Sequence, residues 1–359
     1  MSMSNEMTSV NKEIDNSNFF VRFFKYFVPW KGDKAQEIVR KIIFMGSIVL
    51  FFSSLNELTD FLETDKETLE YSEQIQSLEP VMNQDYNDSF KIGGKKAVSV
   101  DYDAPEKQKR VVQDWAKELL ERNEDVVGWI KIPGFVNSKG KEYINFPVLQ
   151  TDDNDYYLHY SIDKQVYESG SIFVDYDVKI DENGQPDNTI IFGHHMRKLG
   201  TSFTHLAEYK ESVDLLKKCP IVEFNTIYDD SNQEYVIIGC FVGASDEDQD
   251  NGIAFKYWLY RNFDTEKYKF NTWINNVKKA SWYSCDVQCD PEDSYITLST
   301  CSNEVAKTRW VIVAKKLDED DDKEAIIASY TEKEDKDIYF PQVWRDQWGN
   351  EKKYLGWSY

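Results

Sequence analysis

The sequence is short of positive charge, of cysteine, of histidine and of long hydrophobic runs, and each shortage narrows its possible functions. Its 359 residues contain 42 Lys and Arg against 64 Asp and Glu, which gives a formal net charge of -22. Nucleic-acid binding needs a basic surface, so this charge argues against a nucleic-acid partner. We interpret the acidic residues as a solvated surface. A hydrophobic fraction of 41% is enough for a packed core.

Cysteine is scarce and odd in number. The five positions are Cys219, Cys240, Cys285, Cys289 and Cys301. An odd number leaves at least one thiol unpaired in a monomer, so one is a candidate reactive group. Cys285 and Cys289 are four residues apart, but no second pair and no flanking histidine completes a zinc pattern. The cysteines other than the reactive one are interpreted as small buried residues, two of which could form a disulfide.

No uncharged apolar run reaches the length of an ordinary membrane-spanning helix. The segment "IIFMGSIVLFFSSL", residues 42–55, has about 14 residues against the ~20 usually needed, so a buried or interfacial helix is the alternative. Arg40 and Lys41 can snorkel at its start and lengthen the usable span, which favours a single anchor. Basic residues precede the run (Lys31, Lys34, Arg40 and Lys41) and acidic residues follow it (Glu57, Asp60 and Glu63). The positive-inside rule then predicts a cytoplasmic N-terminus, and the lack of a cleavage site predicts an uncleaved anchor.

The chain divides into four predicted parts. Residues 1–62 are expected to form a cytoplasmic segment and membrane anchor, and residues 63–103 a polar stalk and linker. Residues 104–317 form the main folded domain. Residues 318–359 begin with an acidic linker and end in an aromatic tail of unknown role, whose tryptophans argue against disorder.

The main domain is predicted to be mainly β, with helices. Val111, Val112, Trp115, Leu119 and Leu120 recur at helical spacing, so an amphipathic helix opens it. Eight short strands follow, with the sequences "GWIKIPG", "INFPVLQ", "SIFVDY", "NTIIFGHH", "CPIVEFN", "EYVIIGCFVG", "YITLST" and "RWVIVAKKL". Their spacing favours an antiparallel barrel or a sandwich. Aromatic residues at helical spacing between the sixth and seventh strands predict a helical insertion.

The segment "YITLSTCSNEVAKTRW", residues 295–310, contains the candidate reactive cysteine. Side chains alternate between the faces of a strand, so Thr297, Ser299 and Cys301 share the more polar face. A cysteine at the end of that face is more typical of a reactive thiol than of a packed structural one. Arg309 begins the next strand. If the two strands pair, its guanidinium lies near the thiol as a fixed cation that can stabilise an oxyanion.

A cysteine nucleophile also needs a proton shuttle, and histidine is scarce. The four histidines are His159, His194, His195 and His205. In "NTIIFGHHM", His194 follows a predicted buried strand and Gly193, where the backbone can turn and present a side chain at the sheet edge. For His195 the alternative is a simple solvent-exposed neighbour, and we interpret the other two as surface or packing residues. The residues thus permit a Cys–His–Arg site but do not prove one.

Taken together, these motifs resemble the sortases, the membrane-anchored cysteine transpeptidases of Gram-positive bacteria. The resemblance rests on "TLSTC" followed by an arginine at the start of the next strand, with "GHHM" upstream. "GWIKIPG", "INFPVLQTDDNDYYLHY" and "SGSIFVDY" are similar to class B members in particular. So are the helix before the first strand and the helical insertion before the cysteine strand. The resemblance covers about residues 104–317 and implies an eight-stranded closed barrel.

The resemblance also implies a role for individual residues. It places the family's nucleophile on Cys301, its histidine on His194 and its arginine on Arg309. Ser299 and Thr300 match the motif residues ahead of the nucleophile and are implied to shape the substrate groove. The family fills the position of His195 variably. No metal ion or organic cofactor is implied for this chemistry.

The implied function is transpeptidation at the cell surface. The enzyme would cleave a C-terminal sorting signal of surface proteins, an Asn-Pro-X-Thr-like motif, after threonine through a cysteine thioester. The acyl group would pass to an amine of a lipid-linked cell-wall precursor or to a pilin lysine. The implied location is the cell membrane, with a single span and an extracellular catalytic domain. A cysteine peptidase acting on the same signal and an inert membrane-tethered scaffold are the alternatives.

Overall fold

The computed structural model describes residues 24–82, 109–263 and 269–352. Residues 1–23 of the predicted cytoplasmic segment, residues 83–103 of the predicted linker and the end of the aromatic tail lie outside these ranges. The chain forms two compact units, Met1–Lys66 and Glu67–Tyr359. Helix α2 (Ala35–Gln76) begins in the first unit and ends in the second.

Helix α2 contains the predicted anchor run. Within the described residues, it alone is long and apolar enough to cross a membrane. Its apolar side chains are exposed, including Val49, Leu50 and Phe51, which are 64% to 69% accessible. The helix is longer than the uncharged run because residues such as Glu57 and Leu58 continue it with good helical propensity. Length therefore does not prevent this segment from spanning a bilayer.

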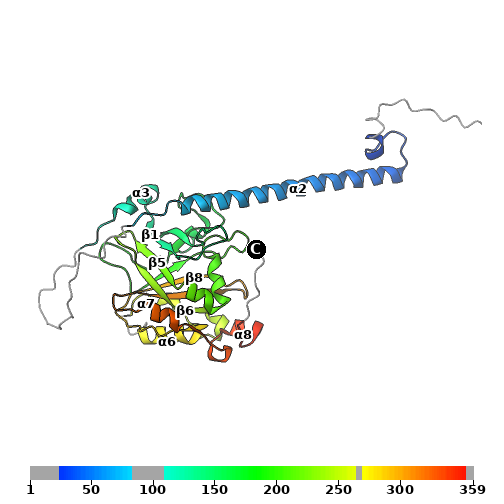
Figure 1. Cartoon of the computed structure of the whole chain (residues 1–359). Coiled ribbons are helices and arrows are strands. Elements are labelled where there is room, and N and C mark those ends of the chain that lie inside the picture. The colour runs from blue at the N-terminus through cyan, green and yellow to red at the C-terminus, as the bar shows by residue number, and fades with distance from the viewer. Residues whose placement is uncertain (1–23, 83–108, 264–268, 353–359) are drawn as a thin grey trace, which may run out of the picture. The chain divides into compact units, whose positions relative to one another are not determined.

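The second unit is a barrel covered by helices (Figure 1). Its strands are β1 (Val126–Lys131), β2 (Asn145–Leu149), β3 (Ile172–Val174), β4 (Asn188–Phe192), β5 (Ile221–Thr226), β6 (Glu234–Ala244), β7 (Tyr283–Ser284), β8 (Tyr295–Cys301), β9 (Thr308–Lys316) and β10 (Thr331–Glu332). Its complete helices are α3 (Asp114–Arg122), α4 (Tyr156–His159), α5 (Val213–Lys218), α6 (Phe270–Ala280), α7 (Lys323–Ser329) and α8 (Gln342–Trp348). Its 3₁₀ turns are η1 (Thr204–Lys210), η2 (Glu247–Asp250), η3 (Tyr257–Leu259) and η4 (Asp335–Asp337).

Eight strands close into the barrel in the order β1-β2-β3-β4-β8-β9-β6-β5. The predicted eight-stranded barrel is confirmed, and each predicted strand segment overlaps one of these strands. The expectation of antiparallel pairing was wrong at two places, because β2–β3 and β4–β8 pair in parallel. Parallel neighbours need a long crossover. The chain supplies one through α4 and another through β5, β6 and the helical insertion.

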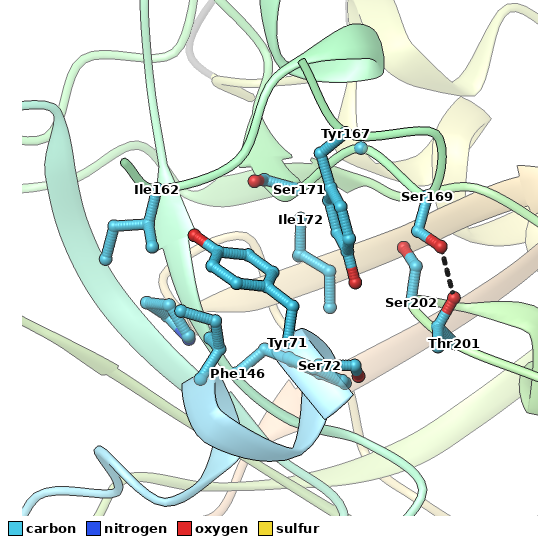
Figure 2. Close-up of a pocket in the computed structure, with 13 residues that line it drawn as sticks. Tyr71, Ser72, Phe146, Ile162, Tyr167, Ser169, Ser171, Ile172, Thr201 and Ser202 are labelled. Atoms are coloured by element: carbon cyan, nitrogen blue, oxygen red, sulfur yellow. Dashed lines mark hydrogen bonds between the residues drawn. The ribbon is translucent and has the colours of Figure 1, made fainter. Parts of the chain in front are cut away.

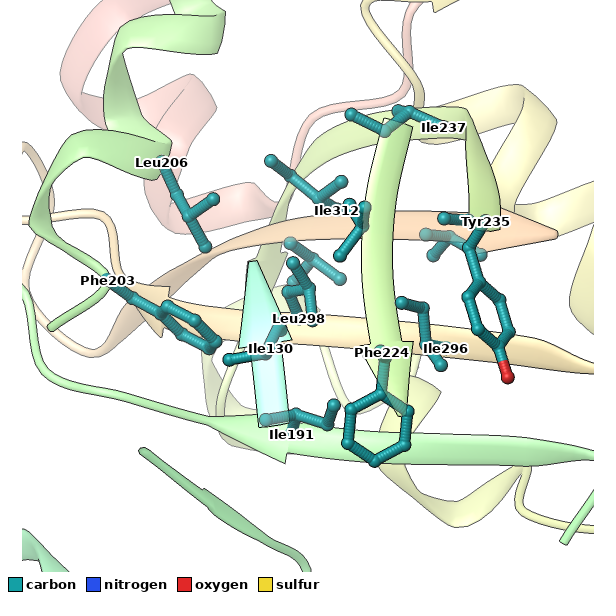
Figure 3. Packing of buried hydrophobic residues seen from close by; sticks show 14 of the residues in the cluster. Ile130, Ile191, Phe203, Leu206, Phe224, Tyr235, Ile237, Ile296, Leu298 and Ile312 are labelled. Atoms are coloured by element: carbon teal, nitrogen blue, oxygen red, sulfur yellow. The ribbon is translucent and has the colours of Figure 1, made fainter. Parts of the chain in front are cut away.

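The barrel interior is filled by branched and aromatic side chains from every side of the sheet (Figure 3). Ile130, Ile191, Leu298 and Ile312 are fully buried there. Burying each such side chain contributes about 1.5–3 kcal/mol, so this core fixes the strand register. Leu298 points inward, which turns the alternate residues of β8 toward the outer surface.

The predicted helical insertion lies between β6 and β8. It contains η2, η3 and α6, and α6 buries Trp273, Ile274 and Val277 on one face. Residues 318–352 fold beyond the last barrel strand as α7, β10, η4 and α8. Helices α6, α7 and α8 lie on the side of the barrel away from α3 (Figure 1). This arrangement leaves the end of β8, with Cys301, beside the insertion.

Candidate active site

Cys301 and Arg309 are in direct contact. They lie opposite each other at the ends of the antiparallel strands β8 and β9. The Arg309 Nη1 atom is 3.3 Å from the Cys301 Sγ atom, and both residues are partly exposed. The guanidinium therefore offers a permanent positive charge and directed N–H groups beside the thiol.

The other cysteines are less suited to reaction. All five cysteines are free thiols. Cys219 and Cys240 are buried, and burial raises the pKa of each thiol. Burial also raises the pKa of Cys285, and that of Cys289 to about 12. A thiol with a raised pKa forms little thiolate, so these four are poor nucleophiles.

His194 follows β4 at the level of Cys301. Phe192 pairs with Ser299 in the parallel register, and the Gly193 N–H donates to the Ser299 carbonyl at 3.2 Å. The strand pairing ends there, and His194 follows two residues after Phe192, near enough to Arg309 for that charge to lower its pKa. A Cβ on Gly193 would approach the Phe203 ring to 2.7 Å, so only glycine fits this close passage.

The His194 ring is held by main-chain and side-chain contacts rather than by the thiol. Its Nε2 atom lies 2.9 Å from the Leu158 carbonyl oxygen, so Nε2 carries the proton that makes this bond. The His194 main-chain N–H donates to the Ser202 hydroxyl at 3.1 Å. Burial lowers the pKa of His194, and the positive charge of Arg309 lowers it further. The imidazole is therefore mainly neutral at neutral pH.

Ser299 and Thr300 lie beneath the site rather than on its surface. They are 1% and 2% exposed. The Ser299 hydroxyl is 2.7 Å from the hydroxyl of Tyr257, a residue of the helical insertion. Burial raises the pKa of Tyr257 to about 12, so its hydroxyl stays protonated and keeps this bond. The polar face of β8 is thus covered by the insertion up to the partly exposed Cys301.

Two functional candidates were missed from the sequence. Tyr257 was seen only as part of a helical aromatic pattern, and its aromatic character alone gave no sign of its contact with β8. The alternative of a solvent-exposed His195 was wrong, because the residue is 7% exposed. Its Nδ1 atom donates to the Cys301 carbonyl at 2.8 Å. Burial lowers its pKa to about 4, which keeps the ring neutral.

The remaining histidines fit their sequence interpretation. His159 is exposed, and its Nε2 atom lies 3.7 Å from Asp155. His205 is buried and stacks on Tyr143, with 3.6 Å between ring centroids. In the part of the chain that the structure describes, no group of three or more His, Cys, Asp or Glu side chains is arranged to hold a metal ion.

A small cavity of about 30 Å³ lies between the end of α2 and the barrel (Figure 2). Tyr71, Ser72 and Ile75, from the end of α2, line it opposite residues of the barrel. Ser202, which holds the His194 main chain, lines it as well. The Tyr167 hydroxyl donates to the Thr68 carbonyl at 3.2 Å and so holds the end of α2 against the barrel. The last turns of α2 therefore pack next to the loop that carries His194.

A family model and two curated relatives all match this chain to the same protein family. A family model described as "Sortase domain" matches residues 130–317. The chain is 32% identical to Sortase B of Listeria monocytogenes over 206 residues, which cover 57% of this chain and 74% of the relative. It is 29% identical to Sortase B of Staphylococcus aureus over 201 residues, which cover 55% of this chain and 73% of the relative.

Solved structures agree at the level of the fold. A crystal structure of sortase B from Bacillus anthracis, in complex with AAEK1, superposes with a TM-score of 0.50. The match covers 72% of this chain and 99% of that chain at 21% identity. The family match ends at residue 317, so α7, β10, η4 and α8 lie beyond it.

Proposed function

Because the chain belongs to the sortase family and is a class B cysteine transpeptidase, we propose that Cys301 is its nucleophile, His194 its proton shuttle and Arg309 its oxyanion-stabilising cation. Enzymes of this family act on sorting signals of surface proteins. The signal we propose is an Asn-Pro-X-Thr-like motif, cleaved after threonine.

The proposed reaction has two acyl-transfer steps. The Cys301 thiolate attacks the threonine carbonyl carbon, and the resulting oxyanion lies against the Arg309 guanidinium. The carbon–nitrogen bond then breaks, and the leaving amine takes a proton from the imidazolium of His194, which leaves a thioester. An incoming amine gives its proton to the neutral imidazole and attacks the thioester, and the thiolate departs. The product is a new amide bond.

The contact between Arg309 and Cys301 carries this proposal. A guanidinium 3.3 Å from the sulfur lies within reach of an oxygen that develops on the carbon bound to that sulfur. Its charge is permanent, so this stabilisation does not depend on pH in the physiological range.

The lowered pKa of His194 is expected to slow the reaction. Proton transfer from Cys301 to His194 works against this lowered pKa, so the thiolate–imidazolium pair is a minor species. We therefore expect slow turnover, because only that minority attacks substrate.

We assign Ser299 and Thr300 an indirect part in substrate binding. Both are buried, so they shape the groove from below. Ser299 acts through its hydrogen bond to Tyr257, which supports the insertion that borders Cys301.

We further propose that α2 anchors the enzyme in the cell membrane. Its apolar length and exposed side chains support this placement, with the catalytic domain outside the cell. The amine acceptor would then be a lipid-linked cell-wall precursor or a lysine of a pilin subunit, both of which are presented at the membrane surface.

The test uses the full chain, purified in detergent, with fluorogenic peptides that carry Asn-Pro-X-Thr-like signals. We expect mass spectrometry to find an acyl adduct on Cys301 and no turnover by Cys301→Ala. Adding an amine acceptor should convert cleaved acid into ligated product, and oligoglycine and lysine-bearing peptides separate the two acceptor classes. Hydrolysis alone would indicate a peptidase. The absence of any adduct across a peptide panel would reject the proposed chemistry.

A further inference from the structure

The main chain that follows Cys301 is held by side chains from the segment after His194. Three successive carbonyl groups, those of Cys301, Ser302 and Asn303, each accept a hydrogen bond from this segment. The donors are His195 to Cys301 at 2.8 Å, Lys210 to Ser302 at 3.3 Å, and Arg197 to Asn303. The Asn303 side chain donates back to the His195 carbonyl at 3.2 Å. We call residues 301–304 the nucleophile loop.

A buried ion pair closes this network. The Lys210 Nζ atom lies 2.5 Å and 2.7 Å from the two carboxylate oxygens of Glu304. The two side chains are 0% and 1% exposed. The same ammonium lies 5.0 Å from the centre of the Trp310 ring. Burial lowers the pKa of Lys210 to about 8, and the carboxylate of Glu304 opposes that shift, so the ammonium form of Lys210 still predominates at neutral pH.

A contribution to folding stability does not by itself explain why this ion pair is buried. Taking two charges out of water costs several kcal/mol each, and apolar residues of similar volume often serve the fold as well. Hydrogen bonds and ion pairs are directional, so they fix the orientation of each peptide group, which apolar packing does not. Here they join two elements that carry different reactive groups, since His194 follows β4 while Cys301 and Arg309 end β8 and begin β9.

We propose that Lys210 and Glu304 are positioning residues, which hold the nucleophile loop so that Cys301 stays in reach of both His194 and Arg309. The proposal rests on the function proposed above. Neither residue touches the reacting atoms. They act through the loop, and His195 adds to their effect by holding the carbonyl group of Cys301 itself.

The test compares two double variants of the full chain. Lys210→Met with Glu304→Gln removes both charges and leaves neither one buried alone. The matched control is Lys315→Met with Asp321→Asn, at the other end of β9. Lys315 is 5% exposed and lies 3.0 Å from Asp321, so the control also removes a shielded ion pair. Circular dichroism and thermal melting establish that each variant is folded.

The measurements are kcat and KM with the signal peptide, and the rate at which iodoacetamide alkylates Cys301. For Lys210→Met/Glu304→Gln we expect kcat to fall at least ~10-fold with KM within ~3-fold, because small misplacements of a reacting group are costly. The alkylation rate should fall at least ~3-fold, because the thiolate loses its place beside Arg309. The control should keep all three values near those of the wild type.

Several outcomes would overturn the proposal. A folded Lys210→Met/Glu304→Gln variant with wild-type kcat would do so, and so would an equal loss of kcat in the control. If the double variant does not fold, Glu304→Asp draws the carboxylate back from the ammonium while keeping its charge, and an unchanged kcat there is equally decisive. If the wild type itself shows no turnover, the proposed function has failed. The alkylation rates of Cys301 then still decide the positioning role.

Discussion

Single residues set the chemistry of the site through charge and proton affinity. Arg309 places a fixed cation beside the thiol of Cys301, and burial lowers the pKa of His194, the proposed proton acceptor. The two effects are linked, because the charge of Arg309 also lowers the pKa of His194. Substitution and pH therefore probe the same electrostatic arrangement in different ways.

Arg309 is expected to act through its geometry as well as its charge. Arg309→Ala should lower kcat/KM by ~10²–10³-fold, as for the loss of an oxyanion donor. Arg309→Lys keeps the charge but loses the planar fork, so we expect a smaller fall of ~10-fold. Kinetics with the signal peptide measure both, and wild-type rates in the lysine variant would show that charge alone suffices.

The pH profile of kcat/KM should have its acid limb below the ordinary histidine range. Protonated His194 cannot accept the proton of Cys301, so activity is lost as pH falls through the pKa of His194. Because that pKa is lowered, the midpoint should lie below ~6.5. Initial rates across about pH 4 to 9 give the midpoint, and a value at or above 6.5 would contradict the role of burial.

At the scale of elements, local pattern predicted the strands but not their neighbours. Alternation identified all eight barrel strands, and helical spacing identified the insertion that contains α6. The parallel pairs β2–β3 and β4–β8 were not predicted, because pairing depends on contacts between residues far apart in the chain. Pattern likewise marked the face of β8 that carries Ser299 as polar, but could not show that Tyr257 covers it.

The residues of the candidate site that lie in sequence motifs were predicted, and those that depend on long-range packing were not. Cys301, His194 and Arg309 stand at strand ends within recognisable motifs. Lys210 and Glu304 carry no such signal, since a charged residue between two strands is usually solvated. Their burial appears only when the segment after β4 folds over the end of β8.

Gly193, between β4 and the loop that follows it, allows a test of how tightly this loop is packed. In Gly193→Ala the new Cβ would lie 2.7 Å from the Phe203 ring and 2.9 Å from the Ser202 hydroxyl, so the loop must shift. We expect the variant to lose about 1–3 kcal/mol in free energy of unfolding. It should also lose activity, because Ser202 holds the main chain of His194. Urea denaturation and kcat/KM measure the two effects, and full retention of both would show that the loop adapts.

In the molecule as a whole, the fold extends past the family match. Residues 318–352 bury Ile326, Tyr330, Phe340 and Trp344 in the same hydrophobic cluster as the barrel. The Tyr339 hydroxyl donates to Asp250 at 2.7 Å, so this segment also contacts η2 of the insertion. The acidic stretch before α7 is therefore followed by a packed structure rather than by a solvated tail.

Trp344 is expected to be central to this packing. It is fully buried, and Trp344→Ala should lower the free energy of unfolding by about 3–5 kcal/mol, through lost burial and a residual cavity. Trp348→Ala is the matched control in the same helix, and it should cost less because Trp348 is only partly buried. Urea unfolding compares them, and equal losses would show that the segment is not anchored mainly by Trp344.

Trp344 also belongs to a series of neighbouring indole rings that ends next to Cys301. Trp282 lies 6.1 Å from Trp344 and 5.1 Å from Trp310, between ring centroids. Trp310 is the sequence neighbour of Arg309 and pairs with Thr300, the residue before Cys301. Rings this close exchange excitation energy. The emission of these three indoles is therefore expected to respond both to the packing of residues 318–352 and to the strands that carry Cys301.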